Sequence, residues 1–327
     1  MLQDLLEKRL RLAQLPTPIE YMPRISKRLG IELYLKRDDL TESIASGNKI
    51  RKLEYLLCDA RERGADAVIT CGGVQSNHCR ATAYAAAKMG MAAVLLLRGE
   101  EPTGLQGNLL INRLLGAECR FFTPGQFRRL PLIEEDVKRD LQKLGKTPYI
   151  IPLGGSNATG SLGYVRMMQE IHEADFHADH LYCALGSGGT LAGILAGKQH
   201  FGFTGKVCGI AVSDDTAYFV GETRRIQQEY ADWYGIEIDF GDLGGQMDDS
   251  YIGKGYALNT QAEWEQLIDL ARLEGLVLDP VYTLKAFLGM MDHCRTGKIA
   301  AGEKVLFIHT GGHSGIFPKV NEFEGLL

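Results

Sequence analysis

Short, nearly continuous apolar runs alternate along the chain with longer segments whose apolar residues recur every three or four positions. The short runs predict buried strands and the longer segments predict helices, because these spacings place apolar side chains on the faces that a core covers. The predicted strands lie at 32–39, 67–73, 92–99, 118–123, 147–155, 180–185, 206–213 and 304–312. The predicted helices cover 50–60, 78–90, 104–116, 130–145, 160–174, 191–201, 260–275 and 282–297. This alternation predicts an α/β fold with parallel sheets.

The length of the chain indicates more than one folding unit. At 327 residues it exceeds the size at which a single hydrophobic core usually stops growing. We therefore expect two open, parallel-sheet α/β domains. Ligands of such sheets bind at the carboxyl ends of the strands, so we expect the site in a cleft between the domains.

The charge balance argues against a nucleic-acid partner. The chain has 36 Lys and Arg residues against 41 Asp and Glu residues, a formal charge of -5, and no long basic block. No stretch approaches the run of about 18 apolar residues that a membrane span needs. A small-molecule partner is therefore expected, with neither nucleic acid nor membrane.

The cysteines predict a cytoplasmic location. They are scattered without a CxxC pair, mostly within apolar runs, which favours reduced thiols. Residues 1–23 mix charges with apolar residues and lack the uninterrupted apolar region of a signal peptide. The seven are Cys58, Cys71, Cys79, Cys119, Cys183, Cys208 and Cys294.

The segment SGNKIRKLEY, residues 46–55, places Lys49, Arg51 and Lys52 at the predicted start of a helix. A solvated basic face is one interpretation, in which Arg51 and Lys52 face solvent or an acidic neighbour. The other is that Lys49 serves as a neutral amine, because the positive end of a helix and neighbouring cations both lower the pKa of a lysine. A neutral lysine can form an imine with a carbonyl compound.

A glycine-rich turn joins a predicted strand to a predicted helix at Gly186, Ser187, Gly188, Gly189 and Thr190. Bare backbone can approach a ligand closely there, and the first N–H groups of the helix can bind a phosphate. The turn is neither a Walker A loop nor a complete GxGxxG motif. A tight turn without a ligand is the alternative.

Polar clusters occupy three more strand ends or helix starts. Ser76, Asn77 and His78 follow a buried strand, where they can cap a helix, the more frequent use, or bind a carboxylate. Tyr282 follows a predicted strand end and a proline turn, and Thr310 ends another buried strand before two glycines. Each is an ordinary cap or turn by itself, but together they lie where an α/β active site belongs.

Two competing interpretations are weaker. His172, His177 and His180 raise the possibility of a metal site, but no acidic or cysteine partner stands at a recognised ligand spacing, and the segment has the pattern of an exposed helix end. We therefore expect no metal. A serine hydrolase would need a GxSxG elbow, and GSG at 186–188 is the nearest approach.

In this order the stretches resemble fold-type II pyridoxal 5'-phosphate (PLP) enzymes of the 1-aminocyclopropane-1-carboxylate (ACC) deaminase and D-cysteine desulfhydrase family. The resemblance implies a tryptophan synthase beta-like fold, PLP as cofactor and a homodimer. It also implies a small domain at 51–161 and a large PLP-binding domain made of 1–50 and 162–327. The motifs that carry it are LPTPIEYMPRIS, LYLKRDDLT, GNKIRKLEYLL, QSNH, PLGGSNATGSLGYV, GSGGTLAG, LDPVYT and LFIHTGG.

The resemblance assigns roles to individual residues. Lys49 matches the lysine that binds the cofactor covalently and later moves the Cα proton of the substrate. Asn77 matches the residue that bonds the 3'-oxygen of the cofactor, while Ser76 and the groups beside it, including His78, match the site of the substrate carboxylate. The segment from Gly186 to Thr190 matches the phosphate cup.

Two tyrosines complete the implied site. Tyr282 matches a tyrosine beside the cofactor ring, and Tyr256 matches a second active-site tyrosine, although the usual YG.PN of the family is YALN here. Ser46 is a further departure, because the family usually has a second glycine before NK.

Two threonines favour the desulfhydrase branch. The deaminases carry Glu at the position of Thr283 and Leu at the position of Thr310. A carboxylate beside the pyridine nitrogen keeps that nitrogen protonated, which the opening of a cyclopropane ring demands. A hydroxyl leaves it largely neutral, which suffices when a thiol leaves from Cβ.

The expected reaction is therefore α,β-elimination on a small β-substituted amino acid. D-cysteine, giving pyruvate, hydrogen sulfide and ammonia, is the first candidate. L-cysteate, D-serine and β-chloro-D-alanine are alternatives, and deamination of ACC is the runner-up. A non-catalytic PLP carrier and a nucleotide-binding protein without PLP are the rivals from other classes.

Overall fold

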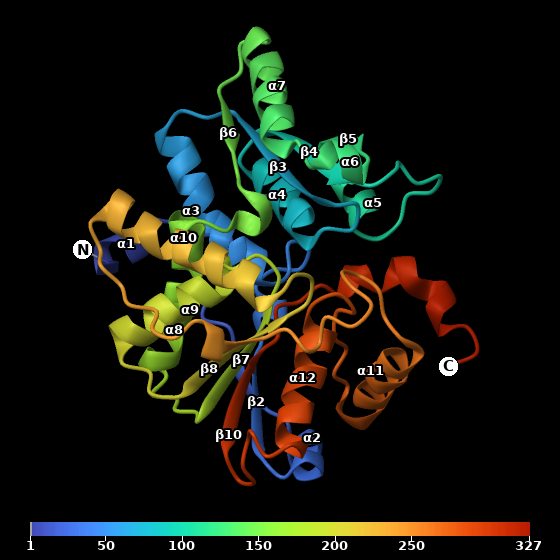
Figure 1. The fold of residues 1–327 in the computed structure, drawn as a ribbon. Helices are drawn as coiled ribbons and strands as arrows, with labels where there is room; N and C mark the ends of the chain where they lie inside the picture. Colours follow the sequence, from blue (N-terminus) through green and yellow to red (C-terminus); the bar gives the residue numbers. More distant parts are fainter. Residues whose placement is uncertain (1) are drawn as a thin grey trace.

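The computed structural model describes residues 2–327 and contains two separate β-sheets (Figure 1). The smaller sheet has the order β5-β4-β3-β6, and all of its strands are parallel. These strands are β3 (Ala67–Gly73), β4 (Ala92–Arg98), β5 (Glu118–Phe122) and β6 (Pro148–Ile150). Strands β3 and β4 are nearly continuous apolar runs because both faces of a parallel sheet are covered.

The larger sheet has the order β1-β2-β10-β7-β8-β9. Strand β1 runs antiparallel to β2, and the other neighbours are parallel. The two ends of the chain meet here, since β10 pairs with β2 and places Leu306 opposite Tyr34. The strands are β1 (Ile19–Tyr21), β2 (Glu32–Lys36), β7 (His180–Leu185), β8 (Lys206–Ala211), β9 (Met247–Asp248) and β10 (Lys304–Ile308).

Helices surround both sheets, as Figure 1 shows. None of those within residues 2–327 is long and apolar enough to cross a membrane. The α-helices are α1 (Leu2–Glu7), α2 (Pro23–Leu29), α3 (Asn48–Glu62), α4 (Asn77–Lys88), α5 (Gly107–Leu114), α6 (Pro124–Phe127), α7 (Leu130–Lys143), α8 (Ala158–Glu173), α9 (Gly189–Phe201), α10 (Thr216–Tyr234), α11 (Gln261–Glu274) and α12 (Thr283–Arg295). Short 3-10 helices are η1 (Asp38–Leu40), η2 (Leu153–Gly155), η3 (Gly244–Gln246), η4 (His313–Gly315) and η5 (Phe317–Phe323).

The α/β class with parallel sheets is confirmed, and each predicted strand overlaps an observed one. The prediction of a strand end at residue 278 was wrong: Leu278 is buried in a core cluster but pairs with no strand. Helix α10 was missed by the sequence analysis. The predicted domain boundaries at 51 and 161 fall inside α3 and α8, and the division itself stays a prediction.

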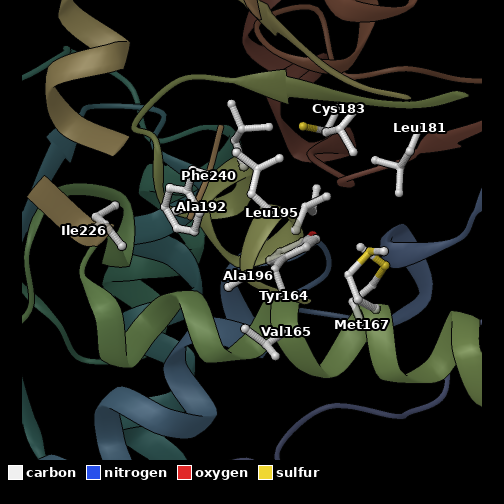
Figure 2. Close-up of a cluster of buried hydrophobic side chains, with 14 of the residues drawn as sticks. Tyr164, Val165, Met167, Leu181, Cys183, Ala192, Leu195, Ala196, Ile226 and Phe240 are labelled. Carbon is white, nitrogen blue, oxygen red and sulfur yellow. The ribbon is translucent and has the colours of Figure 1, made fainter. Parts of the chain in front are cut away.

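Helices α8 and α9 pack closely, and glycines permit the contact. A Cβ atom on Gly193 would lie 2.2 Å from the carbonyl oxygen of Ser161, and one on Gly197 would lie 2.5 Å from the Cβ of Met168. Figure 2 shows the side chains of both helices meeting those of β7 in this core. The packing fixes the start of α9 at Gly189, where the glycine-rich turn ends.

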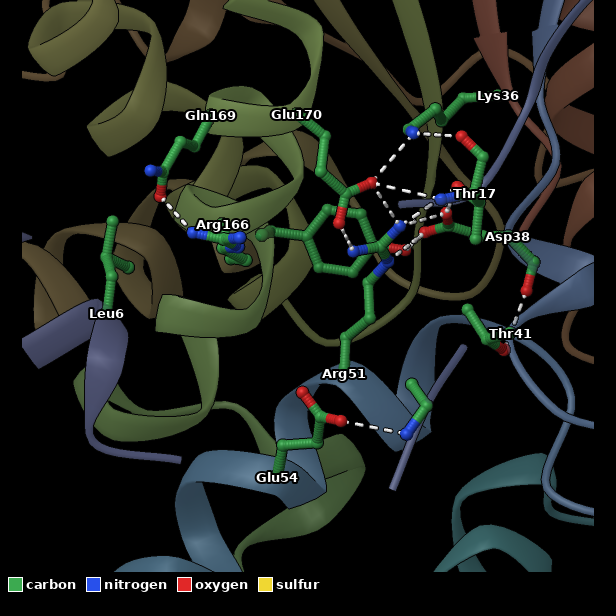
Figure 3. A network of polar contacts seen from close by, with 12 residues as sticks. Leu6, Thr17, Lys36, Asp38, Thr41, Arg51, Glu54, Arg166, Gln169 and Glu170 are labelled. Atoms are coloured by element: carbon green, nitrogen blue, oxygen red, sulfur yellow. Dashed lines mark hydrogen bonds and ion pairs between the residues drawn. The ribbon is translucent and has the colours of Figure 1, made fainter. Parts of the chain in front are cut away.

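A buried ion network joins α3, α8 and the segment after β2 (Figure 3). Arg51 donates hydrogen bonds to Asp38 at 2.8 and 2.9 Å and to Glu170 at 2.7 and 2.9 Å. Lys36 donates to Glu170 at 2.8 Å, and the Tyr164 hydroxyl donates to Asp38 at 2.7 Å. Burial by itself raises the pKa of Glu170, but the charges and hydrogen bonds of Arg51 and Lys36 together outweigh burial and bring this pKa down to about 2.

The interpretation of a solvated basic face was wrong. Arg51 and Lys52 are both completely buried. Their positions in α3 point into the interior because the helix is covered on several sides, by α4 and by α8. The alternative prediction for Arg51, an acidic neighbour, is confirmed, because Arg51 bonds Asp38 and Glu170.

Removal of the Arg51 charge is expected to destabilise the fold strongly. Arg51→Met leaves Asp38 and Glu170 buried without their main partner, so we expect a loss of about 3–5 kcal/mol in the free energy of unfolding. Arg63→Met, at the residue that caps the end of α3, is the matched control, because Arg63 is exposed and its ion pair with Asp59 contributes about 1 kcal/mol or less. Urea denaturation of both variants tests this, and equal losses would contradict the network's role.

Candidate active site

Strand ends and helix starts from both sheets converge on a cavity of about 250 Å³, which adjoins a smaller one of about 20 Å³. Gly189 is the one predicted site residue that lines neither cavity. The larger is lined, among others, by Lys49, Ser76, His78, Arg98, Gly186, Ser187, Tyr256 and Tyr282. The smaller is lined, among others, by Lys49, Asn77, Gly186, Ser187, Gly188, Thr190, Tyr282 and Thr310.

A close backbone contact holds the start of α3 against the end of β10. Gly47 has φ +108°, and a Cβ atom there would lie 2.2 Å from the carbonyl oxygen of Thr310. The same oxygen accepts a hydrogen bond from the Asn48 N–H at 3.2 Å. Gly47 is therefore the glycine that this turn requires, while Ser46 contributes its carbonyl oxygen, which accepts from Arg80 at 2.9 Å.

Lys49 extends from this first turn into both cavities. Its Nζ lies 3.4 Å from the carbonyl oxygen of Gly154 and forms no ion pair. Burial lowers the pKa of Lys49 from 10.5 to about 8. The pKa shift of Lys49 has the predicted direction, but burial is its largest cause and no neighbouring cation contributes to it. The contribution of the helix end stays a prediction.

Lys52 lies one turn further along α3, behind the glycine-rich turn. Its Nζ lies 3.2 Å from the Gly154 carbonyl oxygen and 3.3 Å from the Ser156 hydroxyl. Burial lowers the pKa of Lys52 well below its ordinary value, and the charge of Lys49 lowers it further. A buried amine without a carboxylate partner is a ready counter-charge for an anion.

The glycine-rich turn presents bare backbone beside this amine. Gly188 has φ +78°, and α9 begins at the next residue. A Cβ atom on Gly189 would lie 2.6 Å from the Ser156 hydroxyl and 2.9 Å from the Lys52 Nζ. The Ser156 hydroxyl accepts from the Gly189 N–H at 3.3 Å and lies 2.9 Å from that of Ser187. Such a helix start, with an amine beneath it, is built to bind a phosphate.

Helix α4 begins on the other side of the cavity. The Ser76 hydroxyl accepts from the Cys79 N–H at 3.2 Å, so the capping interpretation holds for this residue. The amide oxygen of Asn77 accepts from Asn108 at 2.9 Å and from Arg80 at 3.2 Å, which fixes its side chain. As at any helix start, the other first-turn N–H groups of α4 have no partner within the helix.

His78 is buried beneath the cavity. Its Nε2 lies 2.8 Å from the Thr70 hydroxyl, which donates to the Ile151 carbonyl oxygen at 2.9 Å. Burial lowers the pKa of His78 well below its ordinary value, so the imidazole is neutral. Its other ring nitrogen, Nδ1, has no hydrogen-bond partner.

The two tyrosines form a pair. The hydroxyls of Tyr256 and Tyr282 lie 2.5 Å apart, and burial raises the pKa of both phenols. Ala257 follows with φ +59°, a conformation that normally favours glycine. Alanine thus stands at a left-handed position in YALN, and the match of Tyr256 to the second tyrosine of the family stays a prediction.

The two threonines differ in position. Thr310 lines the smaller cavity. The hydroxyl of Thr283 accepts from the Asp279 N–H at 2.7 Å and donates to the Asp279 carbonyl oxygen at 3.2 Å, so the backbone occupies it. Only the first of them is available to a ligand in the cavity.

Sequence reasoning missed Arg80 and Asp279. Asp279 is buried, and its carboxylate accepts from the Tyr282 N–H at 2.5 Å and from Asn77 at 3.4 Å. Burial raises the pKa of Asp279 to about 6 and lowers that of Arg80 to about 10. The signal for Arg80 was a charged residue inside the otherwise apolar helix HCRATAYAAAK.

The three histidines of 172–180 lie in different surroundings. His172 and His177 are exposed, whereas His180 is buried in β7 and bonds Glu303 at 2.9 Å, so the expected exposed helix end stops before it. Among residues 2–327, the group that could ligate an ion is Asp39, His309 and His313. Arg37 already donates two hydrogen bonds to the carboxylate of Asp39, at 2.6 and 2.9 Å.

A buried lysine amine of lowered pKa, facing one helix start suited to phosphate and another suited to carboxylate, defines an enzyme site for a phosphorylated carbonyl cofactor. The chain belongs to the family of pyridoxal-phosphate dependent enzymes, whose model matches residues 10–311. PLP is therefore its cofactor, and the predicted fold-type II class is confirmed.

Similar proteins narrow the family. A Thermotoga maritima protein with the provisional name 1-aminocyclopropane-1-carboxylate deaminase is 43% identical over 314 residues, covering 94% of this chain and 97% of that protein. The bifunctional D-cysteine desulfhydrase/1-aminocyclopropane-1-carboxylate deaminase of Arabidopsis thaliana mitochondria is 39% identical, covering 97% and 81%. A solved structure described as an ACC deaminase homologue has a TM-score of 0.91 and 40% identity, covering 100% and 99%. The chain is thus in the ACC deaminase and D-cysteine desulfhydrase group.

The lowered pKa of Lys49 predicts a pH-dependent stability in the cofactor-free protein. Between pH 8 and 10.5 the folded state loses this proton while the unfolded state keeps it, so stability gains a rising contribution over that window. Lys49→Met removes the contribution. The free energy of unfolding of the wild type should therefore rise relative to the variant from pH 8 to 10, and parallel curves in urea denaturation would contradict the shift.

Proposed function

We propose that the chain is a PLP-dependent lyase that eliminates a β-substituent from a small amino acid. The observation that carries the proposal is the Lys49 amine, which has a pKa of about 8 and opens onto a cavity between two helix starts. An amine with this pKa is partly neutral near pH 7 and can act both as nucleophile and as base.

The residues present fit the cofactor. The phosphate would bind at the turn from Gly188 to Thr190, where α9 begins, with Lys52 behind the turn as counter-charge. Lys49 would bind the aldehyde carbon, and Asn77 would bond the ring oxygen. When bound, PLP supplies the electron sink that stabilises negative charge at the substrate Cα.

The protein groups would do the remaining work. Lys49 takes the proton from Cα, since its amine is the base within the cavity. Ser76 and the first N–H groups of α4 orient the substrate carboxylate. Tyr256 and Tyr282 keep their protons because their pKa values are raised, so the pair can donate a proton to the departing group.

D-cysteine is the proposed substrate, with pyruvate, hydrogen sulfide and ammonia as products. Thr310 supports it, because this residue offers the cavity a hydroxyl and no charge. Deamination of ACC is the second candidate. The names of the relatives from Thermotoga maritima and Arabidopsis thaliana support ACC as a substrate at least as well as D-cysteine. L-cysteate, D-serine and β-chloro-D-alanine need only a different fit of the β-substituent.

The proposed setting is a cytoplasmic homodimer. The resemblance to the family is the basis for the dimer. All seven cysteines are free, which is consistent with reduced thiols.

A product assay distinguishes the candidates. The purified holoenzyme is incubated with D-cysteine, L-cysteine, D-serine, L-cysteate or ACC, and pyruvate, sulfide and 2-oxobutyrate are measured. We expect pyruvate and sulfide from D-cysteine. Formation of 2-oxobutyrate from ACC alone would replace the first candidate by the second.

The same assay tests the base. Lys49→Ala should lower turnover by roughly a hundred- to ten-thousandfold, the usual contribution of a general base. Lys88→Ala, at the exposed end of α4, is the control and should leave turnover unchanged. Full activity of Lys49→Ala would refute the proposed role.

A further inference from the structure

Arg98 is a cation in the larger cavity that the reaction described above does not use. It is the last residue of β4, its side chain is exposed, and it lines the cavity together with Lys49 and Ser76. Among residues 2–327 it has no hydrogen-bond acceptor and no ion-pair partner, in contrast to Arg51 and Arg80.

Two aromatic rings hold the guanidinium group in place. Its central carbon lies 5.7 Å from the centre of the Tyr256 ring and 5.9 Å from that of the Phe127 ring. A cation between rings is attracted by their faces and loses little of its hydrogen-bonding capacity. All five N–H donors of Arg98 therefore remain available to a ligand.

Arg98 belongs to a different element from the groups assigned to the cofactor and to the substrate carboxylate. The phosphate is assigned to the start of α9 and the carboxylate to the start of α4 at Ser76. Tyr256 connects Arg98 to the reacting end of the cavity, because its ring lies against the guanidinium group and its hydroxyl bonds Tyr282. The β-substituent is the part of the substrate that remains.

We propose that the β-substituent pocket of this chain accepts an anionic group, such as a sulfonate, and that Arg98 is the specificity-determining residue that binds it. This inference rests on the proposed elimination and, among the substrates proposed above, favours cysteate over D-cysteine. Asp214 lines the same cavity, but no ion pair joins it to Arg98 among residues 2–327. A guanidinium group binds sulfonate or carboxylate through two parallel hydrogen bonds.

The elimination balances with such a substrate. The Cα–H bond breaks and its proton goes to Lys49, while the Cβ–S bond breaks and the sulfonate leaves with the bonding electrons as sulfite. Water then replaces nitrogen on the remaining three carbons, which gives pyruvate and ammonium. No oxidant or reductant is needed.

The test compares anionic and neutral amino acids of similar size. Calorimetry gives the dissociation constants of the holoenzyme for aspartate and asparagine, and kinetics give kcat/KM for cysteate and cysteine, with both enantiomers of each. Arg98→Gln should lower the preference for the anionic member of each pair by roughly ten- to a hundredfold, and Arg98→Lys should retain part of it. Arg128→Gln is the matched control, because Arg128 is an exposed arginine that lines neither cavity.

The outcomes separate the two proposals. An unchanged preference in Arg98→Gln, an equal loss for both members of a pair, or no binding of aspartate by the wild type overturns the role of Arg98. Absence of product from every amino acid, cysteine included, counts against the proposed elimination, and the calorimetric ratio still decides whether Arg98 binds an anion.

Discussion

The contact of Arg51 with Asp38 and Glu170 is the interaction on which the rest of the site depends. It joins α3 to α8 and to the segment that follows β2. Because the three charged side chains are buried, each needs its partner at hydrogen-bond distance. Loss of one partner leaves an uncompensated charge in the interior. Lys49 lies two residues before Arg51. The contacts of Arg51 that hold α3 in place therefore also fix the position of the Lys49 amine.

Three lysine and arginine residues of one helix start thus have three different uses. Arg51 is neutralised by carboxylates and secures the helix. Lys52 has only uncharged partners and lies behind the glycine turn, ready for an anion. Lys49 faces the cavity with a pKa lowered by burial. Lys49 and Lys52, three positions apart, share one face of the helix and both approach the Gly154 carbonyl oxygen, whereas Arg51 points to another face.

The strands and the glycine and polar clusters at their ends could be predicted from the sequence, because apolar runs, turn residues and helix caps are local signals. The partner of Arg51 could not, since Glu170 lies 119 residues away in the chain. The cause of the lowered pKa of Lys49 could not be predicted either, because burial depends on contacts between distant parts of the chain. Arg98 was equally invisible, because only the folded chain places Phe127 and Tyr256 around it.

The central claim is that Lys49, and not the more deeply buried Lys52, is the lysine that reacts with PLP. Reduction of the holoenzyme with borohydride fixes the cofactor on its lysine, and peptide mapping by mass spectrometry then locates it. Our account predicts the cofactor mass on Lys49 alone, with Lys52 unmodified. A modified Lys52 in the wild-type protein, or no modified lysine in α3, would contradict it.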